Sequence, residues 1–506
     1  MKGGAVIIGC GAAGLSAALF LARHGGHVTL VADMPPERAQ SSLAVGGINA
    51  ALGDGDSAEN HARDTLSAGH FLAGETAVRG MTEAAPSIIR ELEASGAVFR
   101  KDNDRAYSLR RMGGQSCGRA VHAAGGIGRQ VMDALANELR RHEAKGEIEC
   151  RFGWSFRRLA LVGDRVCGAW IRHSASSETA FLPGPVVMAC GGLNGVFGFT
   201  TGSVANTGEA AASLFADGVP FSNLEFIQFH PTTIRLRGKS LLVSEAARSE
   251  GGRLFVLRDG RPFHFLEEKY GPNGSLMPRD VISREEWRWL SAGHQVYLDL
   301  RHLNEDSRRR LSGSYDDCIR LAGLDPAGQP IPVEPGIHYF MGGIQVDCRH
   351  RSPMEGLYAA GECACQYHGA NRLGGNSLLG ALYGGIVAAR EILGRTMETP
   401  PEPSRPAHSD QPQAKEAERQ AIMRKALGVV RDEAGLRAGV LALDRLPRHD
   451  EMTLLCRAML LSALARGESR GSHFRSDCPE SRKEFRKNIV TSMKDGEVGM
   501  TMGEAR

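Results

Sequence analysis

A glycine-rich segment near the start of the chain has the residue types and spacing to bind a pyrophosphate. Its sequence is Gly9-Cys10-Gly11-Ala12-Ala13-Gly14, directly after the apolar run Ala5–Ile8. Glycines let the backbone approach a pyrophosphate, and the start of a helix expected at Leu15–Arg23 offers unpaired N–H groups to the anion. A second strand is expected at Val28–Val31. Strand, glycine turn, helix and strand in this order favour a dinucleotide site over a turn without a ligand.

The second strand of such a unit is normally followed by an acidic residue that holds the ribose. Here Ala32 stands at the end of the strand and Asp33 follows. Asp33 is therefore the candidate for this role, and a ribose held in another way is the alternative.

Two later segments repeat the pattern of an apolar strand that ends at a glycine turn. Val186–Cys190 runs into Gly191-Gly192, and Leu357–Ala360 runs into Gly361-Glu362. Each is a buried-type strand that ends at a glycine turn, and such ends would line one crevice of a doubly wound parallel sheet. We therefore predict a nucleotide domain that is interrupted between about Phe229 and Tyr339.

A helix start is expected at Asn376-Ser377, before the helical run Leu378–Leu393, because Asn and Ser are frequent N-caps. A helix N-terminus aimed at a flavin ring would stabilise the anionic reduced flavin. An ordinary capped helix is the alternative.

Length and composition limit the classes of protein to consider. The chain has 506 residues, enough for two or three domains. Its formal net charge of +3 does not indicate binding to nucleic acid or an anionic membrane. The 11 cysteines have no CxxC pair and no ligand spacing, so we expect free thiols and no metal site. No apolar run reaches the length of a membrane span, and we expect a cytoplasmic protein.

A series of further motifs identifies a family. In chain order these motifs are Ser41–Ile48, Gln228–Thr232, Ser244–Gly252, Pro278–Asp280, His338–Gly343, Gly361-Glu362 and His368–Leu378. With them the chain resembles the flavoproteins of fumarate reductase, succinate dehydrogenase and L-aspartate oxidase. The resemblance extends to about Ile392, and Ser469–His473 resembles the C-terminal motif of the family.

The resemblance implies an α/β fold with a doubly wound, Rossmann-like FAD-binding domain, an inserted α+β capping domain and a C-terminal helical domain. The expected ranges are 1–228 and 340–398 for the FAD-binding domain, 229–339 for the capping domain, 399–413 for a linker and 414–506 for the C-terminal domain and tail. Proline and polar residues at Thr399–Pro412 favour the linker. Helical spacing is present at Ala414–Val430 and Met452–Ala465, and the tail from Lys494 is expected to be disordered.

The resemblance also implies which residues contact FAD. They are Gly9, Gly11, Ala12, Ala13, Gly14, Asp33, Ser41, Ser42, Gly46, Gly47, Gly191, Gly192, Glu209, Glu362, Asn376, Ser377 and Leu378. Gln40 stands where respiratory members carry the histidine that is bonded to FAD. We therefore expect non-covalent FAD.

The residues that match the substrate motifs imply a site for a C4 dicarboxylate. Arg372 should bind one carboxylate, since a guanidinium can do so through two parallel hydrogen bonds. His230 and His338 should donate to carboxylate oxygens, with Ser244 assisting. Each histidine taken alone would more often have a structural role.

Arg279 matches the proton donor of the family. An arginine with a pKa above about 12 is a poor acid, so it can act only as a relay. Glu245 and Arg248 match the residues that reload it. A salt-bridge network in the capping domain is the structural alternative.

The choice within the family depends on Met112, which precedes Gly113-Gly114. L-aspartate oxidases resemble one another in a glutamate there, thought to receive the substrate ammonium. We therefore favour a fumarate reductase or succinate dehydrogenase type of flavoprotein. The alternative is an L-aspartate oxidase that forms iminoaspartate, which Ala32 and Gln40-Ser41 favour. A second alternative is a non-catalytic flavin-binding subunit.

A fumarate reductase and an L-aspartate oxidase differ in their need for an electron donor. A fumarate reductase of this type would need an iron–sulfur partner subunit or free reduced flavin, and a partner could hold the chain at the inner face of the membrane. An L-aspartate oxidase would need neither, because oxygen or fumarate can reoxidise it.

Overall fold

The nucleotide region is built on a parallel sheet. The computed structural model describes residues 4–102, 106–394, 415–447 and 450–503. The strands lie in the order β21-β12-β1-β2-β8, and each pairs with its neighbours in parallel. Their bounds are β1 (Ala5–Ile8), β2 (Val28–Ala32), β8 (Ile148–Phe152), β12 (Val186–Met188) and β21 (Leu357–Ala359). The near-continuous apolar runs are typical of parallel strands that are covered on both faces.

The two faces of this sheet carry different layers. Val6 and Ile8 pack into a core shared with an antiparallel sheet, whereas Ala5 and Ile7 pack against helices, because successive strand residues point to opposite faces. The antiparallel layer is β9 (Trp154–Val162), β10 (Arg165–His173) and β11 (Thr179–Pro183), and the helical layer is α1 (Ala12–Arg23), α3 (Glu75–Ala94), α4 (Ile127–Ala144) and α12 (Asn376–Leu393). The expected α/β class is therefore present, with a β-sheet in place of helices on the second face.

Shorter elements complete the nucleotide region. They are η1 (Pro36–Arg38), η2 (Gln40–Leu43), β3 (Ile48–Asn49), α2 (Ala58–Ala68), β4 (Lys101–Asp102), β5 (Ala106–Tyr107), β6 (Leu109–Arg110), β7 (Ala120–Val121), α5 (Asn194–Phe197), α6 (Glu209–Ala216) and η5 (Gly361–Cys363).

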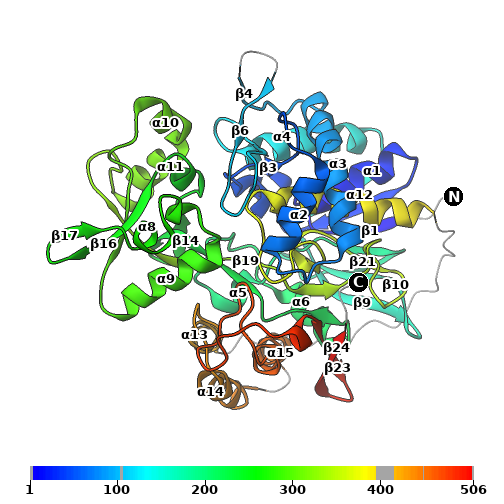
Figure 1. Ribbon diagram of the computed structural model, residues 1–506. Coiled ribbons are helices and arrows are strands. Elements are labelled where there is room, and N and C mark those ends of the chain that lie inside the picture. Colours follow the sequence, from blue (N-terminus) through cyan, green and yellow to red (C-terminus); the bar gives the residue numbers. More distant parts are fainter. Residues whose placement is uncertain (1–3, 103–105, 395–414, 448–449, 504–506) are drawn as a thin grey trace.

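A second lobe projects from this region, drawn in green at the left of Figure 1. Its antiparallel sheet has the order β15-β14-β19-β18-β16-β17. The strands are β14 (Ile227–Leu236), β15 (Lys239–Leu242), β16 (Arg253–Arg258), β17 (Arg261–Phe263), β18 (Val296–Asp299) and β19 (Ile331–Phe340). The helical elements are α7 (Ala246–Ser249), α8 (Phe265–Tyr270), η3 (Gly274–Leu276), α9 (Arg279–Ser291), α10 (Glu305–Arg310), α11 (Ser312–Asp317) and η4 (Cys318–Ala322). The paired strands β14 and β19 connect the lobe to the nucleotide region.

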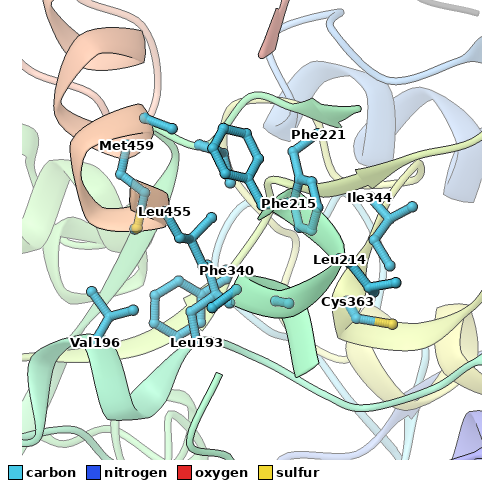
Figure 2. Packing of buried hydrophobic residues seen from close by; sticks show 14 of the residues in the cluster. Leu193, Val196, Leu214, Phe215, Phe221, Phe340, Ile344, Cys363, Leu455 and Met459 are labelled. Carbon is cyan, nitrogen blue, oxygen red and sulfur yellow. The ribbon is translucent and has the colours of Figure 1, made fainter. Parts of the chain in front are cut away.

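The C-terminal helices pack on the nucleotide region. They are α13 (Glu416–Ala426), α14 (Glu433–Leu443) and α15 (Glu451–Ala465). Figure 2 shows Leu455 and Met459 of α15 beside Leu193 and Phe340, which belong to the same buried cluster. The helix α14 was not predicted from the sequence. The expected linker 399–413 lies outside the described residues.

The expectation of a disordered tail from Lys494 is wrong for its described part. β23 (Asn488–Lys494) and β24 (Glu497–Gly503) form a hairpin that joins a sheet of order β22-β20-β13-β23-β24. The other strands are β13 (Phe221–Ser222), β20 (Gly343–Gln345) and β22 (Ala364–Cys365). Asp495 and Gly496 both have positive φ, as a tight hairpin turn of Asp-Gly type requires. Ile489 is buried on β23 and fixes the hairpin against the body of the protein.

Within the described ranges, no helix is both long enough and apolar enough to cross a membrane.

Candidate active site

One cavity of about 570 Å³ extends from the carboxyl ends of β1, β2 and β12 to the second lobe. Most of the residues expected to contact FAD line it. These are Gly9, Gly11, Ala12, Ala13, Asp33, Ser41, Ser42, Gly46, Gly47, Gly191, Gly192, Glu209, Glu362, Ser377 and Leu378. Gly14 and Asn376 do not line it.

Gly9 lies in the tight turn between β1 and α1, and Gly14 lies in the first turn of α1. Gly9 has φ +108°, a conformation that favours glycine, and a Cβ there would lie 2.7 Å from the carbonyl carbon of Ala189. A Cβ on Gly14 would collide with the Gly9 carbonyl. Gly14 therefore allows the helix to pack closely on the strand, behind the cavity wall, which is why the expected ligand contact is absent.

The start of α1 faces the cavity. Gly11 is its N-cap residue and provides no side chain, while the Ala12 N–H donates to Ser41 Oγ over 3.0 Å. N–H groups at a helix start attract anions. This geometry suits a pyrophosphate between the glycine turn and Ser41.

Asp33 lies at the far end of the same cavity, directly after β2. Its Oδ1 accepts a hydrogen bond of 2.9 Å from Ser174 Oγ. That contact holds the carboxylate at the rim, where a ribose hydroxyl of a dinucleotide would lie.

Asn376 is fully buried behind the cavity and does not act as the N-cap of α12. Gly375 is the N-cap, with φ +86°. The Asn376 Oδ1 accepts from Asn49 Nδ2 over 2.7 Å and from His61 Nε2 over 2.9 Å, and its Nδ2 donates to Thr65 Oγ1. The amide therefore joins α12 to α2 and β3, and Ser377 and Leu378 present the helix start to the cavity.

Glu362 follows β21 and is half-buried at the cavity wall. Its Oε1 accepts from the Phe340 N–H over 3.1 Å. Burial raises its pKa to about 7, against the backbone hydrogen bond and the charge of Arg372. A carboxyl group with this pKa can accept a hydroxyl hydrogen bond at modest electrostatic cost. Together with the glycine cradle, the helix start and Asp33, it gives the cavity a polar contact for each part of an FAD chain, and the residues present fit that cofactor.

Two guanidinium groups meet at the end of the cavity nearest the second lobe. Arg279 Nη1 and Arg372 Nη2 each donate to Gln228 Oε1 over 2.9 Å. Gln228 Nε2 in turn donates to Asn371 Oδ1 and to the Arg372 carbonyl, both over 2.8 Å. The Arg372 guanidinium lies 4.4 Å from the centre of the Tyr339 ring, a cation–π distance.

Arg372 is a buried cation with unused donors. It is 3% exposed, and its Nε has no hydrogen-bond partner among the described residues. Burial and the charge of Arg279 lower its pKa to about 9. A bound carboxylate would supply both the missing acceptor and the missing negative charge.

His230 and His338 face one another beside these arginines, with ring centres 5.2 Å apart and planes at 68°. The Thr232 N–H donates to His230 Nδ1 over 3.3 Å, so the ring proton resides on Nε2. Thr201 Oγ1 lies 2.7 Å from His338 Nδ1. Burial and the charge of Arg279 hold the pKa of both rings well below the ordinary range. Both are therefore neutral at pH 7.

Glu245 is a buried carboxylate behind Arg279. Its Oε2 accepts from Arg279 Nε over 2.8 Å and from Nη2 over 2.5 Å, and its Oε1 accepts from the Gly113 N–H over 2.9 Å. Burial opposes ionisation, but Arg279 and Arg248 hold the pKa of Glu245 at about 2. Arg248 Nη2 lies 3.7 Å from Glu245 Oε1.

The arrangement brings the expected substrate residues together at one place. Arg279, Glu245, His230, His338, Arg372 and Ser244 all line the cavity, and Arg248 lies behind Glu245. Three further residues of the site, Gln228, Tyr339 and Thr201, were not among the residues predicted from the sequence. Gln228 and Tyr339 lie inside the family motifs. Their contacts with Arg372 form only when β14, β19 and the segment before α12 pack together, and the sequence does not show this packing.

Gln40 and Met112 also line the cavity. The Gln40 Oε1 accepts from the Ser203 N–H. Met112 is 2% exposed, and a Cβ on Gly46 would lie 3.0 Å from its Cε. Both side chains are fixed in place.

Two family models match parts of the chain. Residues 4–378 match the family model described as FAD binding domain, and residues 442–504 match that described as Fumarate reductase flavoprotein C-term. The chain is 35% identical to the succinate dehydrogenase flavoprotein subunit of Bacillus subtilis (strain 168), with 94% of this chain and 91% of that protein covered.

Relatives of another activity are equally similar. The L-aspartate oxidase of Mesorhizobium japonicum is 37% identical, with 94% of this chain and 92% of that protein covered. Among solved structures, E. coli quinol fumarate reductase superposes with a TM-score of 0.90 at 26% identity, and 100% of this chain and 97% of that chain are covered.

Proposed function

Because the chain belongs to the FAD-dependent flavoprotein family of fumarate reductase, succinate dehydrogenase and L-aspartate oxidase, we propose that it is a fumarate reductase type of oxidoreductase. The observation that carries this proposal is a cationic pocket whose wall offers the Met112 thioether, not a carboxylate, before Gly113-Gly114. Such a pocket suits a substrate with two negative charges and no ammonium group.

The cations of the pocket support a dicarboxylate substrate. Arg372 has an unused donor and lies beside Arg279, and both guanidiniums are buried. Two buried like charges are stabilised when anionic groups bind between them. We infer that Arg372 binds one carboxylate, and that His230 and His338 donate from Nε2 to carboxylate oxygens.

In the mechanism we propose, FAD supplies a hydride at N5 when it is bound and reduced. Arg372 and the histidines would hold fumarate so that its alkene faces the ring, which removes translational freedom from the reaction. Their donors would also stabilise the negative charge that develops on the substrate after hydride addition. Arg279 would deliver the proton to the second alkene carbon.

Glu245 supports this role for Arg279. It accepts two hydrogen bonds from the Arg279 guanidinium and lies 3.7 Å from Arg248. A carboxylate between two guanidiniums can pass a proton from one to the other. We infer that Arg248 and Glu245 reload Arg279 after each turnover.

L-aspartate oxidase is the second candidate, because several relatives at 32–37% identity carry that name. Its substrate brings an ammonium group that needs an anion. Glu245 is a carboxylate of the pocket, but its oxygens already accept hydrogen bonds from Arg279 and the Gly113 N–H. This occupation argues against aspartate.

We also propose that the FAD is non-covalent. The side chain at the position of the flavin-linking histidine is Gln40, an amide that cannot bond to the flavin and that is held by the Ser203 N–H. One relative is named a flavoprotein subunit, and we propose an iron–sulfur partner as the source of electrons for this chain.

Anaerobic flavin absorbance tests the proposal directly. L-aspartate is added to the oxidised protein, and fumarate is added to the dithionite-reduced protein. Reoxidation by fumarate with no response to aspartate is the expected result. Bleaching by aspartate would identify an L-aspartate oxidase and overturn the argument from Met112. A flavin that responds to neither would indicate the non-catalytic subunit.

A further inference from the structure

The two arginines of the substrate pocket come from different parts of the chain. Arg279 begins α9 in the second lobe, whereas Arg372 belongs to the segment 368–375 that precedes α12. Inside the cavity both donate to Gln228. In the proposed mechanism, Arg279 must lie beside the alkene of a substrate whose carboxylate is bound by Arg372. The protein therefore has to hold these two elements at a fixed distance from one another.

A second bridge joins the same two elements outside the cavity. Asp280 follows Arg279 in the chain, and Asn371 precedes Arg372. The Asn371 Nδ2 donates to Asp280 Oδ1 over 3.0 Å. The two side chains are 7% and 3% exposed, and neither of them lines the cavity. A buried hydrogen bond to a carboxylate is one of the stronger neutral-to-charged contacts in a protein, so this bond is suited to hold α9 against the segment before α12.

The bridge outside the cavity is connected to the one inside it. The Asn371 Oδ1 accepts from Gln228 Nε2 over 2.8 Å, and Gln228 Oε1 holds both arginines. An amide side chain donates from its nitrogen and accepts at its oxygen. Asn371 therefore uses its donor on Asp280 and its acceptor on Gln228. A shift of Asp280 would be passed on to the oxygen that spaces the two guanidiniums.

Asp280 is also held from the C-terminal part of the chain. Arg284 lies one helical turn after it on α9, and Arg284 Nη1 donates to Asp280 Oδ2 and to the Gly471 carbonyl, each over 3.0 Å. The same guanidinium lies 5.4 Å from the centre of the Phe474 ring. Arg284 thus ties the start of α9 to residues 471–474.

Residues 471–474 hold the other element as well. The N–H and the Oγ of Ser472 both donate to the Ala370 carbonyl, each over 3.0 Å. Gly471 has φ +53°, and a Cβ there would lie 2.6 Å from the Ala370 carbonyl oxygen. Glycine is therefore required for this close approach. One short C-terminal segment contacts both α9 and the chain just before Arg372.

We propose that Asp280 and Asn371 are positioning residues, which place Arg279 relative to Arg372 and are supported from behind by residues 471–474. This inference rests on the proposed function. The pair does not touch the substrate, so its loss should leave binding intact and misplace the proton donor. Misplacement by a fraction of an ångström lowers the rate of the chemical step more than it lowers affinity.

An exchange of the two side chains tests the pairing. In Asp280→Asn, the new amide faces the Asn371 amide and Arg284, and it can satisfy only one of them. In Asn371→Asp, two carboxylates face each other. In the double variant, the amide at position 280 can donate to the carboxylate at position 371 and accept from Arg284. The carboxylate at position 371 can still accept from Gln228, so all of these hydrogen bonds are restored.

Two quantities are measured for each FAD-loaded variant. Turnover per bound FAD is followed with reduced viologen and saturating fumarate, and malonate affinity is followed by the change in flavin absorbance. Each single variant should lose about 10- to 100-fold in kcat, with the affinity for malonate unchanged. The double variant should recover most of the lost activity, since paired changes at contacting residues are not additive.

Glu285→Gln is the matched control. Glu285 lies on the same helix, and its carboxylate pairs with Lys269 and Arg288, which are 46% and 54% exposed. This variant should behave as wild type in both measurements.

Three outcomes would overturn the proposal. These are wild-type kcat in both single variants, a double variant no more active than the weaker single variant, and a loss of malonate affinity that equals the loss of rate. If the single variants do not retain FAD, Arg284→Gln carries the test, because its side chain is 23% exposed at the outer end of the bridge. It should lower kcat and leave malonate affinity unchanged, and an unchanged kcat would overturn the proposal. A wild type with no activity towards fumarate refutes the proposed function instead, and with it the step for which the pair is positioned.

Discussion

Arg279 and Arg372 donate hydrogen bonds to the same atom, the Oε1 oxygen of Gln228, each over 2.9 Å. One neutral oxygen thus holds two buried cations side by side before a substrate arrives. The amide fixes their spacing without neutralising them, so the charge that attracts a dicarboxylate is retained.

Two substitutions of Gln228 should show separately what the shared acceptor does for stability and what the positive charge of the two arginines does for binding. Gln228→Leu leaves guanidinium donors unsatisfied and should cost roughly 1–3 kcal/mol of stability. Gln228→Glu would pair with both arginines and should weaken binding of a dianion by about tenfold or more. Urea unfolding and the malonate-induced change in flavin absorbance measure the two effects. Equal malonate affinity in wild type and Gln228→Glu would show that the shared oxygen does not face the substrate carboxylates.

Arg279→Gln should abolish most fumarate reduction. Loss of a positioned proton donor costs about 10²–10⁴-fold in rate, and Glu245 loses its principal partner. The control is Arg288→Gln on the same helix, where the side chain is 54% exposed and paired with Glu285. Steady-state turnover at saturating fumarate is the measurement. Activity within a few-fold of wild type would remove Arg279 from the proton path.

Met112→Glu should add the anion that an ammonium group requires. The variant is expected to gain flavin bleaching by L-aspartate under anaerobic conditions and to bind fumarate more weakly. Met112→Gln is the matched control, since it adds polarity without charge. If wild type and Met112→Glu respond to aspartate alike, the identity of this residue does not select the substrate.

Denaturing the protein in acid should release all of its FAD. Gln40 has no ring nitrogen that could bond to the flavin. After precipitation and centrifugation, flavin absorbance is expected in the supernatant and none in the protein pellet. A yellow pellet that withstands washing would mean that another side chain holds the cofactor covalently.

Stability should fall as the pH is lowered from 7 to 5. Burial lowers the pKa of His61 and His350 to about 4, whereas an unfolded histidine titrates near pH 6.5. The unfolded chain therefore binds protons that the folded chain excludes, and stability present above pH 6.5 is lost as the pH falls towards 4. Each histidine contributes a slope of up to about 1.4 kcal/mol per pH unit.

Urea midpoints between pH 7.5 and 5 test this expectation. His350→Gln should show a shallower dependence than wild type. A midpoint that does not change over this range would mean that the buried rings accept protons in the folded state.

Much of the nucleotide fold was predictable because its signals are local. The apolar run before Gly9 gives β1, and the glycine turn and the helix that follows lie within one short segment. The strand ends at Gly191 and Gly361 carry the same signal. Asp33 could be placed at the cavity because it follows β2 directly, whereas Ser41 was placed by the family resemblance.

Other features depend on long-range packing that no local pattern contains. Asn376 looked like an N-cap, but its amide is taken up by His61 and Thr65 of α2. The helix α14 was missed because Gly435 and Gly439 lower helix propensity. Gly439 is there because a Cβ would lie 2.8 Å from that of Ala426 on α13. The Asp495-Gly496 turn is a local signal for a hairpin. The strand that this hairpin pairs with, β13, lies more than 260 residues earlier, so the sequence does not reveal the pairing.

The order of strands in the parallel sheet also constrains synthesis on the ribosome. β1 lies between β2 and β12, and β12 needs β21, which ends at Ala359. The cofactor cradle therefore cannot close before β21 has emerged, because its last wall is made long after its first. Until β12 is made, β1 has no partner on the side away from β2, and a strand with an unpaired edge makes a nascent chain prone to aggregation. We therefore expect the complete flavin cradle to exist only after β21 has paired with β12.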